Sequence, residues 1–300
     1  MTTSFTCIVC GRGEFSLLTE VGRGGKPARF WICSTCGTLR QDPEFKSHWD
    51  PRAAYESGAY FQENSELPPE RMWKSQRADA RWRLGFLRRR GEAPPCRILE
   101  IGCSAGAFLS AARSAGFEAE GIEPDPSMAA FVRDQLKFEV FQGIWEDFPK
   151  AGPWDVICAF HVIEHVEDVN RFLRFARSRL EPGGTLFIET PDALRPWTAR
   201  PAWVDWFDLG HVTGYHAASL AHVLKRGGFD SMMIDEREQL RMIAEPGEEL
   251  NEQESWGDAP IRVRRAFEAF SREHAGRRRR GAMRRVLTAP FRQLMALLGR

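Results

Sequence analysis

"ILEIGCSAGAFL", residues 98–109, consists of a mostly apolar strand, a small loop that contains glycine, and the first turn of a helix. A loop of this kind, at the carboxyl edge of a parallel sheet, binds nucleotide-like ligands, because glycine lets the backbone approach the ligand and the helix N-terminus favours anionic groups. A dinucleotide fingerprint would place glycine at 102, 104 and 107, whereas this chain has Gly102, Ser104 and Ala107, with its other glycine at Gly106. The loop is therefore a poor cradle for a pyrophosphate.

The sequence around this loop alternates between short apolar runs and amphipathic segments. We expect strands at 96–102, 118–124, 138–143, 154–160 and 183–191, and helices at 106–116, 127–136 and 169–180. This alternation predicts an α/β fold with a Rossmann-like, doubly wound parallel sheet. Glu123 ends the second strand 21 positions beyond Gly102, where a carboxylate can accept hydrogen bonds from ribose hydroxyls. NAD and S-adenosylmethionine both contain that ribose, but S-adenosylmethionine has no phosphate and suits this loop better.

Four segments together resemble, in order and spacing, class I S-adenosylmethionine-dependent methyltransferases. They are the glycine loop, "GIEPDPSM" (121–128), the run from "WDVICAF" to "ETPD" (154–192) and "LGHVTGYHAASLAHVLKRGGF" (209–229). The resemblance implies that the loop lines the methionine and ribose, that Ile144 and Trp145 flank adenine, and that Phe160 and His161 lie beside the sulfonium. The full cofactor-binding set that it implies is Glu100, Gly102, Cys103, Ser104, Gly106, Glu123, Pro124, Ile144, Trp145, Phe160 and His161.

This resemblance has one departure and one alternative. Many relatives have aspartate at the position of Ile144, where it contacts the adenine amino group, so Ile144 would leave apolar packing or a backbone contact instead. The alternative interpretation is that the glycines only permit tight packing of a strand against a helix in some other α/β protein.

Two cysteine pairs precede the predicted core. Cys7 and Cys10 are separated by 22 residues from Cys33 and Cys36, a spacing typical of the two knuckles of a zinc ribbon, in which four thiolates close a tetrahedral site. Such a closed site has no open position for substrate, so we expect residues 1–45 to form a structural zinc ribbon. The alternative is a set of free or redox-active thiols.

The charge of the predicted ribbon bears on its partner. Residues 1–45 carry five basic and four acidic side chains, far from the basic footprint that phosphate binding requires. Nucleic acid is therefore a disfavoured partner, although an RNA methyltransferase that uses the ribbon for recognition stays an alternative. A ribbon directly before a methyltransferase core instead resembles enzymes of sugar and polysaccharide biosynthesis, including nucleotide-sugar C-methyltransferases, and implies a small, sugar-containing acceptor.

Three histidines are the candidate catalytic bases, because neutral imidazole accepts protons near pH 7. His161 and His165 follow the strand 154–160, and His211 follows the last predicted strand. In the sugar C-methyltransferases a Glu-His pair stands at the position of Gly210 and His211, so only the histidine carries over. This departure leaves both O- and C-methylation open. Aromatic residues nearby could form a platform for a sugar face or a lid packed on the core: Trp197, Trp203, Trp206, Phe207 and Tyr215.

The remaining segments complete the expected organisation. We predict a helical connector at 46–93, the methyltransferase domain at 94–239, an acidic linker at 240–260 and a basic helical tail at 261–300. The tail carries twelve Arg against two Glu, and residues 277–300 have an amphipathic pattern that favours peripheral contact with an anionic membrane or docking on the protein itself or on a partner. With no apolar leader and no run long enough to cross a bilayer, we expect a cytoplasmic location.

These observations predict an enzyme that transfers a methyl group from S-adenosylmethionine to a small acceptor, through O- or C-methylation. A rival from a different class is a non-catalytic module that binds S-adenosylmethionine without turnover. The sequence does not identify the acceptor, the methylated atom or the oligomeric state.

Overall fold

The computed structural model describes residues 5–22, 26–45, 50–59, 67–194, 210–236, 239–248 and 256–269. Its main sheet has seven strands in the order β10-β11-β8-β7-β4-β5-β6. Five of them run parallel, namely β4 (Arg97–Ile101), β5 (Glu118–Glu123), β6 (Val140–Gln142), β7 (Trp154–Phe160) and β8 (Leu180–Thr190). The chain reverses direction across the sheet after β6, so the carboxyl ends of β4 and β7 flank the point where nucleotide-like ligands bind.

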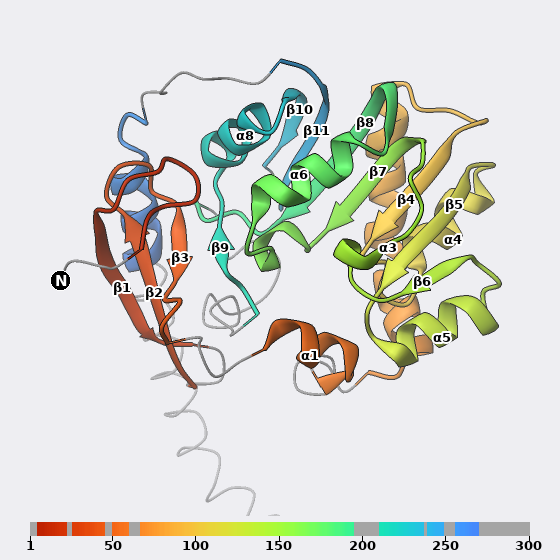
Figure 1. Cartoon of the computed structure of the whole chain (residues 1–300), viewed down its shortest axis with the longest axis horizontal. Coiled ribbons are helices and arrows are strands. Elements are labelled where there is room, and N and C mark those ends of the chain that lie inside the picture. Colours follow the sequence, from red (N-terminus) through yellow and green to blue (C-terminus); the bar gives the residue numbers. More distant parts are fainter. Residues whose placement is uncertain are drawn as a thin grey trace, which may run out of the picture.

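Helices cover both faces of this sheet, which confirms the predicted fold class (Figure 1). One face carries α3 (Pro69–Arg90), α4 (Ala107–Ser114) and α5 (Pro126–Asp134), and the other carries α6 (Val169–Arg177) and α8 (Ala217–Arg226). Helix α6 shows why these segments are helical. Its Phe172, Leu173 and Ala176 are buried, while arginines occupy the other side and Asp168 caps its N-terminus through the amide of Arg171.

Strand β11 (Leu240–Pro246) corrects the predicted acidic linker over 240–260. It lies antiparallel between β8 and β10 (Phe229–Asp235), so the sheet is mixed rather than wholly parallel. Leu240, Met242 and Ala244 are fully buried. The strand was hidden in the sequence because a buried arginine, Arg241, interrupts its short apolar run, and acidic residues follow it directly.

A second sheet holds the predicted ribbon. It is antiparallel, with the order β1-β2-β3-β9, and it comprises β1 (Phe15–Val21), β2 (Pro27–Cys33), β3 (Leu39–Gln41) and β9 (Thr213–Gly214). Strand β9 comes from the distant segment that follows His211. The amino-terminal module is therefore built into the core by a shared strand.

Further contacts join this module to the core. The guanidinium of Arg226, at the end of α8, donates to the carbonyls of Val9 at 2.6 Å and Ile8 at 2.5 Å. The carbonyl of Cys36 lies 2.7 Å from Nε2 of His216, the residue that caps α8. Because a carbonyl only accepts, Nε2 of His216 carries the hydrogen.

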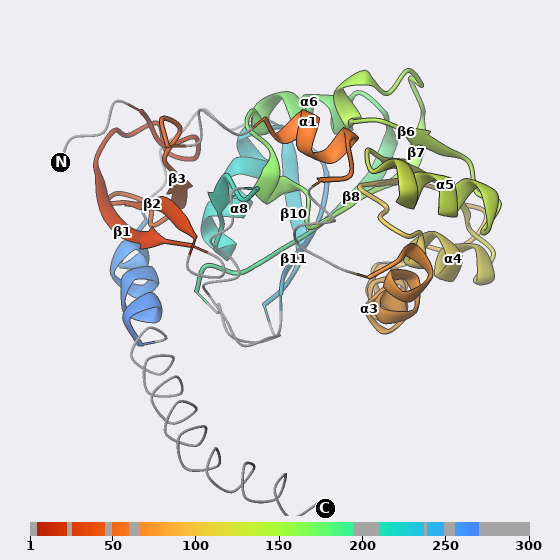
Figure 2. The same cartoon turned by 90° about the horizontal axis from the view of Figure 1, so that it is seen from below.

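Residues 259–269 form a helix that packs against β1 and β2 and begins inside the predicted linker (Figure 2). Its Ala259 is buried, its Val263 packs in one cluster with the ribbon residues Phe30 and Ile32, and Arg264 donates to Oγ of Ser16. This part of the predicted tail therefore docks on the protein itself. The amphipathic segment 277–300 lies outside the described residues.

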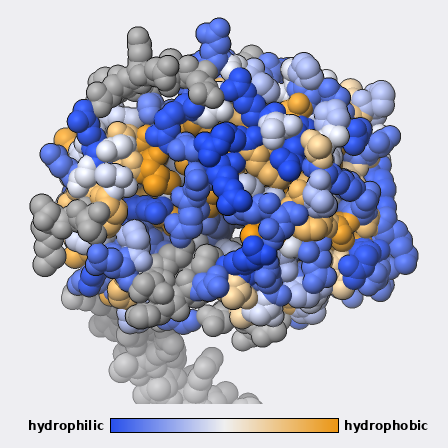
Figure 3. All heavy atoms as spheres, viewed as in Figure 1, coloured by the Kyte–Doolittle hydropathy of each residue, from blue (hydrophilic) through white to orange (hydrophobic). Residues whose placement is uncertain are grey.

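The surface of the described part is mostly polar. Figure 3 shows hydrophilic residues over most of one face, with hydrophobic residues in small separate patches. Among the residues that the structure describes, the exposed large hydrophobic side chains are Leu17, Val21, Ile234 and Ile261. Within the described ranges, every helix is too short or too polar to span a membrane.

Candidate active site and cysteine centre

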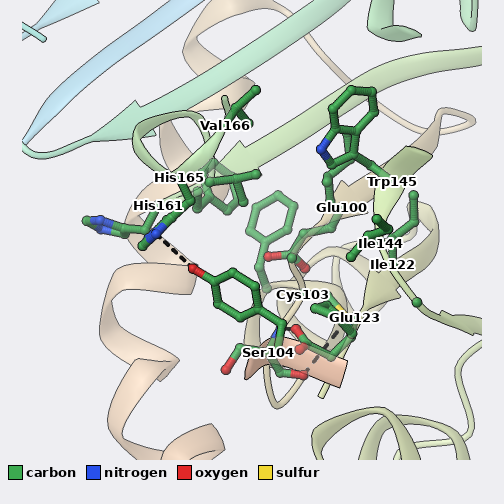
Figure 4. Close-up of a pocket in the computed structure, with 18 of the residues that line it drawn as sticks. Glu100, Cys103, Ser104, Ile122, Glu123, Ile144, Trp145, His161, His165 and Val166 are labelled. Carbon is green, nitrogen blue, oxygen red and sulfur yellow. Dashed lines mark hydrogen bonds between the residues drawn. The ribbon is translucent and has the colours of Figure 1, made fainter. Parts of the chain in front are cut away.

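A pocket of about 410 Å³ opens at the carboxyl ends of β4, β5 and β7 (Figure 4). Ser104 and Glu123 lie at one end of it, and His161 and His165 at the other. Eleven cofactor-binding and three catalytic residues were expected from the sequence, with His161 counted in both sets. The pocket is lined by all of them except Gly106: Glu100, Gly102, Cys103, Ser104, Glu123, Pro124, Ile144, Trp145, Phe160, His161, His165 and His211.

The glycine loop takes a left-handed backbone at three alternate positions. The φ angles are +71° at Gly102, +48° at Ser104 and +74° at Gly106, which is the N-cap of α4. A Cβ atom on Gly102 would lie 2.7 Å from Cγ2 of Val162, and one on Gly106 would lie 2.9 Å from Cγ2 of Val132. Glycine is thus required at 102 and 106, whereas Ser104 tolerates its angle at some strain.

Two buried carboxyl groups face the pocket from neighbouring strands. Glu123 accepts hydrogen bonds from the amides of Ser104 at 2.7 Å and Asp125 at 2.9 Å. Burial raises the pKa of Glu123 to about 7, against the opposing effect of these amides. Burial likewise raises the pKa of Glu100 to about 8, and its Oε2 has no hydrogen-bond partner among the described residues. A ligand that donates hydrogen bonds or carries a positive charge would offset the cost of burying these two carboxylates in their ionised form.

The opposite wall of this half of the pocket is apolar. Ile144 precedes a short 3-10 turn, η2 (Trp145–Asp147), and Trp145 packs edge-on against Phe172 and Phe175 of α6 at ring distances of 5.3 and 5.2 Å. The indole is therefore fixed in place beside the pocket. This arrangement fits a flat apolar ligand group.

His161 is held between two carboxylates. Its φ is +56°, its Nδ1 lies 3.3 Å from Oε1 of Glu164, and its Nε2 lies 3.2 Å from Oε1 of Glu189. Burial alone would lower the pKa of His161, but the two carboxylates raise it to about 9. An imidazole that is already protonated cannot accept a proton at neutral pH, so the geometry argues against His161 as the base.

Glu189 is the centre of a buried ionic cluster that the sequence analysis missed. It accepts hydrogen bonds from Arg83 on α3, at 2.5 and 3.2 Å, and from Nε of Arg241 on β11. The guanidinium of Arg83 also lies 4.3 Å from the centre of the Phe160 ring. The cluster therefore ties α3 and β11 to the strand end that carries His161.

Tyr55 is a second pocket residue that the sequence analysis did not assign to the site. It lies on α1 (Pro51–Glu56), which contacts the core through an ion pair between Arg52 and Asp147. The Tyr55 hydroxyl is 2.8 Å from Nδ1 of His165, and that nitrogen is 2.9 Å from the carbonyl of Gly210. A carbonyl only accepts, so we assign the hydrogen to Nδ1 and the lone pair to Nε2. The aromatic run "YESGAYF" (55–61) in the predicted connector was the available signal in the sequence.

His165 and His211 meet at this end of the pocket. Their ring centres are 4.7 Å apart, although the residues come from different loops. Of the predicted aromatic platform, Tyr215 is fully buried and is not among the residues that line the pocket. The other four residues, Trp197, Trp203, Trp206 and Phe207, lie outside the described residues.

The four cysteines of the ribbon converge as predicted. Their Sγ atoms all lie within 4.8 Å of one another, with 3.6 Å between Cys7 and Cys36 and 3.6 Å between Cys10 and Cys33. A disulfide would require about 2.05 Å, whereas a tetrahedral site with Zn–S bonds of about 2.3 Å places its sulfurs roughly 3.8 Å apart. The cluster therefore has the donor set and the dimensions of a four-thiolate metal centre.

Comparison with known families assigns the core. Residues 68–232 match the family model described as "Methyltransferase domain". This chain belongs to that methyltransferase family. The match covers more than half of the chain and begins at the start of α3, so it includes the helix that supplies Arg83.

Curated relatives match a shorter stretch. A ubiquinone biosynthesis O-methyltransferase of Azorhizobium caulinodans is 32% identical over 100 residues, which are 31% of this chain and 40% of that protein. Another of the same name, from Xanthomonas campestris pv. campestris, is 30% identical over 117 residues, which are 36% of this chain and 48% of that protein. The chain thus spans less than half the length of these two relatives.

A solved structure also resembles this methyltransferase. Magnesium protoporphyrin IX methyltransferase of Synechocystis PCC 6803, with S-adenosylmethionine bound, is 12% identical, with a TM-score of 0.49. The similarity covers 66% of this chain and 98% of that one.

Proposed function

We propose that this chain transfers a methyl group from S-adenosylmethionine to an oxygen atom of a small acceptor. The observation that carries the proposal is a single pocket with two different ends, one built from Glu123, Glu100 and the glycine loop, the other from Tyr55 and the histidines. Family membership supports methyl transfer. Oxygen is favoured over carbon because the curated relatives are named O-methyltransferases and because Gly210 replaces the expected glutamate.

The residues of the first end fit S-adenosylmethionine, which supplies a methyl group on a sulfonium sulfur when it is bound. The carboxylate of Glu123 is placed to accept from ribose hydroxyls, and Ile144 and Trp145 offer an apolar wall for adenine. The unpartnered Oε2 of Glu100 suits a positively charged amino group. The left-handed Gly102 lets the backbone approach the ligand without a side chain in the way.

The residues of the second end fit an acceptor hydroxyl. Methyl transfer is an in-line displacement with a good leaving group, so the chain must mainly align the acceptor oxygen and favour loss of its proton. His165 and His211 approach each other here, and the hydrogen bond of His165 to Gly210 directs its unprotonated nitrogen away from the backbone. His161, which carries a proton at neutral pH, helps to hold Glu164 and Glu189 in place.

The cysteine centre fits a zinc ion with a structural role. Four thiolates would complete a tetrahedral shell and leave no open position for a substrate, and three of the four cysteines are buried. Contacts between the ribbon and the core, through β9 and Arg226, support a role in holding the core. Metal analysis of the reduced protein is expected to give about one zinc per chain, and Cys33→Ser should abolish it; a metal-free, folded wild type would contradict the proposal.

Calorimetric binding of S-adenosylmethionine tests the first end. Glu123→Gln is expected to weaken binding about tenfold or more, because the neutral amide accepts fewer and weaker hydrogen bonds. Glu120→Gln is the matched control, since Glu120 lies on the same strand and pairs with Lys150 instead. No binding by the wild type would overturn the proposal.

Transfer of labelled methyl groups tests the acceptor. Phenols with adjacent hydroxyls are tested as one class of small acceptor, and nucleotide sugars represent the acceptor that the ribbon resemblance favours. Label in either small-molecule class supports the proposal. Label in RNA alone would favour the ribbon-guided alternative, and binding without any transfer would favour a non-catalytic module.

A further inference from the structure

Three potential metal ligands meet at the acceptor end of the pocket. One ligand atom each from Glu164, His165 and His211 lies within 4.8 Å of the other two. Two imidazoles and a carboxylate form a donor set that suits divalent first-row metals and leaves coordination positions open. The set is separate from the cysteine centre, because its donors are nitrogen and oxygen.

Each of these residues is anchored from behind. Nδ1 of His165 bonds to the carbonyl of Gly210 at 2.9 Å, and Oε2 of Glu164 accepts from Oγ1 of Thr190 at 3.0 Å. The amide of Val212 donates to the carbonyl of Glu164 at 2.7 Å, which holds the segment after His211 against Glu164. Metal ligands are typically oriented by bonds of this kind to backbone and side-chain groups.

Glu164 retains the capacity to bind a cation. Its side chain is fully buried, and its Oε1 lies 3.3 Å from Nδ1 of His161. A carboxylate offers about four lone-pair positions, of which His161 and Thr190 take two. His161 also bonds to Glu189, so its positive charge is shared between two carboxylates and does not cancel that of Glu164 alone.

The open side of the cluster lies toward the pocket. His165 and His211 both line the pocket, so a cation held by these residues would have the pocket on its free side. Three protein ligands with open positions are the arrangement of catalytic metal sites, where the ion lowers the pKa of a bound oxygen.

We propose that Glu164, His165 and His211 hold a divalent cation that binds two adjacent oxygens of the acceptor, as in a catechol or a vicinal diol. The inference rests on the proposed function and gives it a substrate class. The acceptor O–H bond breaks, and its proton passes to water at the pocket mouth. The oxygen then forms the new C–O bond while the C–S bond breaks and its electron pair goes to sulfur.

Electron paramagnetic resonance with Mn²⁺ tests the site on the full chain without turnover. Mn²⁺ prefers oxygen and nitrogen to thiolates, so it does not report on the cysteine centre. We expect about one bound Mn²⁺ per chain, weakened about tenfold or more by Glu164→Gln and His211→Ala. His211→Asp, which restores a ligand, should bind Mn²⁺ again, and His222→Gln, on α8 beside Trp256, should bind like the wild type.

Thermal melting and S-adenosylmethionine binding show whether each variant is folded. Wild type that binds S-adenosylmethionine but not Mn²⁺ would overturn the cation site and leave the proposed function intact. Equal Mn²⁺ binding by Glu164→Gln and wild type, or loss in His211→Asp as well as in His211→Ala, would also overturn it. A chain that binds Mn²⁺ but not S-adenosylmethionine would instead contradict the proposed function.

Discussion

Replacing Glu189 with glutamine should strongly destabilise the fold. The Glu189 side chain is only 2% exposed, and its partners Arg83 and Arg241 are 12% and 5% exposed. Removing one partner of a buried ion pair typically costs about 3–5 kcal/mol, because the remaining charge stays buried without compensation. Glutamine keeps one oxygen that can still accept from one arginine, so we expect the lower end of this range, about 3 kcal/mol.

Urea unfolding at pH 7 measures this loss, with Glu181→Gln as the control on the same strand. Glu181 is not buried, and its replacement should change the free energy of unfolding by less than about 0.5 kcal/mol. A second readout is the NMR titration of His161, whose pKa should fall from about 9 when one of its two carboxylates is neutralised. A loss below about 1 kcal/mol together with an unchanged His161 titration would refute the reasoning.

Three further predictions follow from single contacts. Gly102→Ala should weaken S-adenosylmethionine binding about tenfold or more in calorimetry. The new Cβ would lie 2.7 Å from Cγ2 of Val162, and the φ of +71° disfavours alanine. Unchanged affinity would contradict this prediction. The pKa of His161 is raised to about 9 from 6.5, so its contribution to stability is complete below pH 6.5 and disappears as the pH rises through 9. Because the ring is 39% exposed, solvent screening limits this contribution to about 1 kcal/mol. The free energy of unfolding of the wild type minus that of His161→Gln should therefore be about 1 kcal/mol larger at pH 6 than at pH 10, since Glu100 and Glu123, which also titrate in this range, are present in both proteins. Arg40→Ala should slow turnover about tenfold and leave S-adenosylmethionine affinity within about twofold, since Arg40 bonds to Thr213 beyond the cofactor end of the pocket. Equal losses of turnover and of affinity would contradict the idea that the two ends of the pocket act separately.

The features that the sequence predicted well are those encoded by nearby residues. The glycine loop, the strand before it and the carboxylate of Glu123 lie within about one βαβ unit, where spacing along the chain fixes spacing in space. The two cysteine pairs are similar, because each pair lies within one tight turn, at Gly11 and Gly37, which have φ angles of +72° and +77°.

The features that it missed depend on long separations. Glu189 pairs with an arginine 106 positions earlier and another 52 positions later, and Tyr55 reaches a histidine 110 positions away. No periodicity or local motif carries such contacts. The misassigned strand β11 has the same cause, because Arg241 is held in a buried strand by its pairing with Glu189 and its contact with the ring of Trp82, both distant in sequence.

The ribbon holds the acceptor end of the pocket in place. Directly after His211, the carbonyl of Val212 accepts from the amide of Gln41 in β3, at 2.9 Å, while the amide of Val212 donates to Glu164. Residues 213–214 then continue as the fourth strand of the ribbon sheet. His211 is thus fixed from one side by the ribbon and from the other by the loop that carries His165. A ribbon of nearly neutral charge can therefore serve the proposed small acceptor by positioning a residue of the pocket, whereas nucleic-acid recognition would require a basic surface.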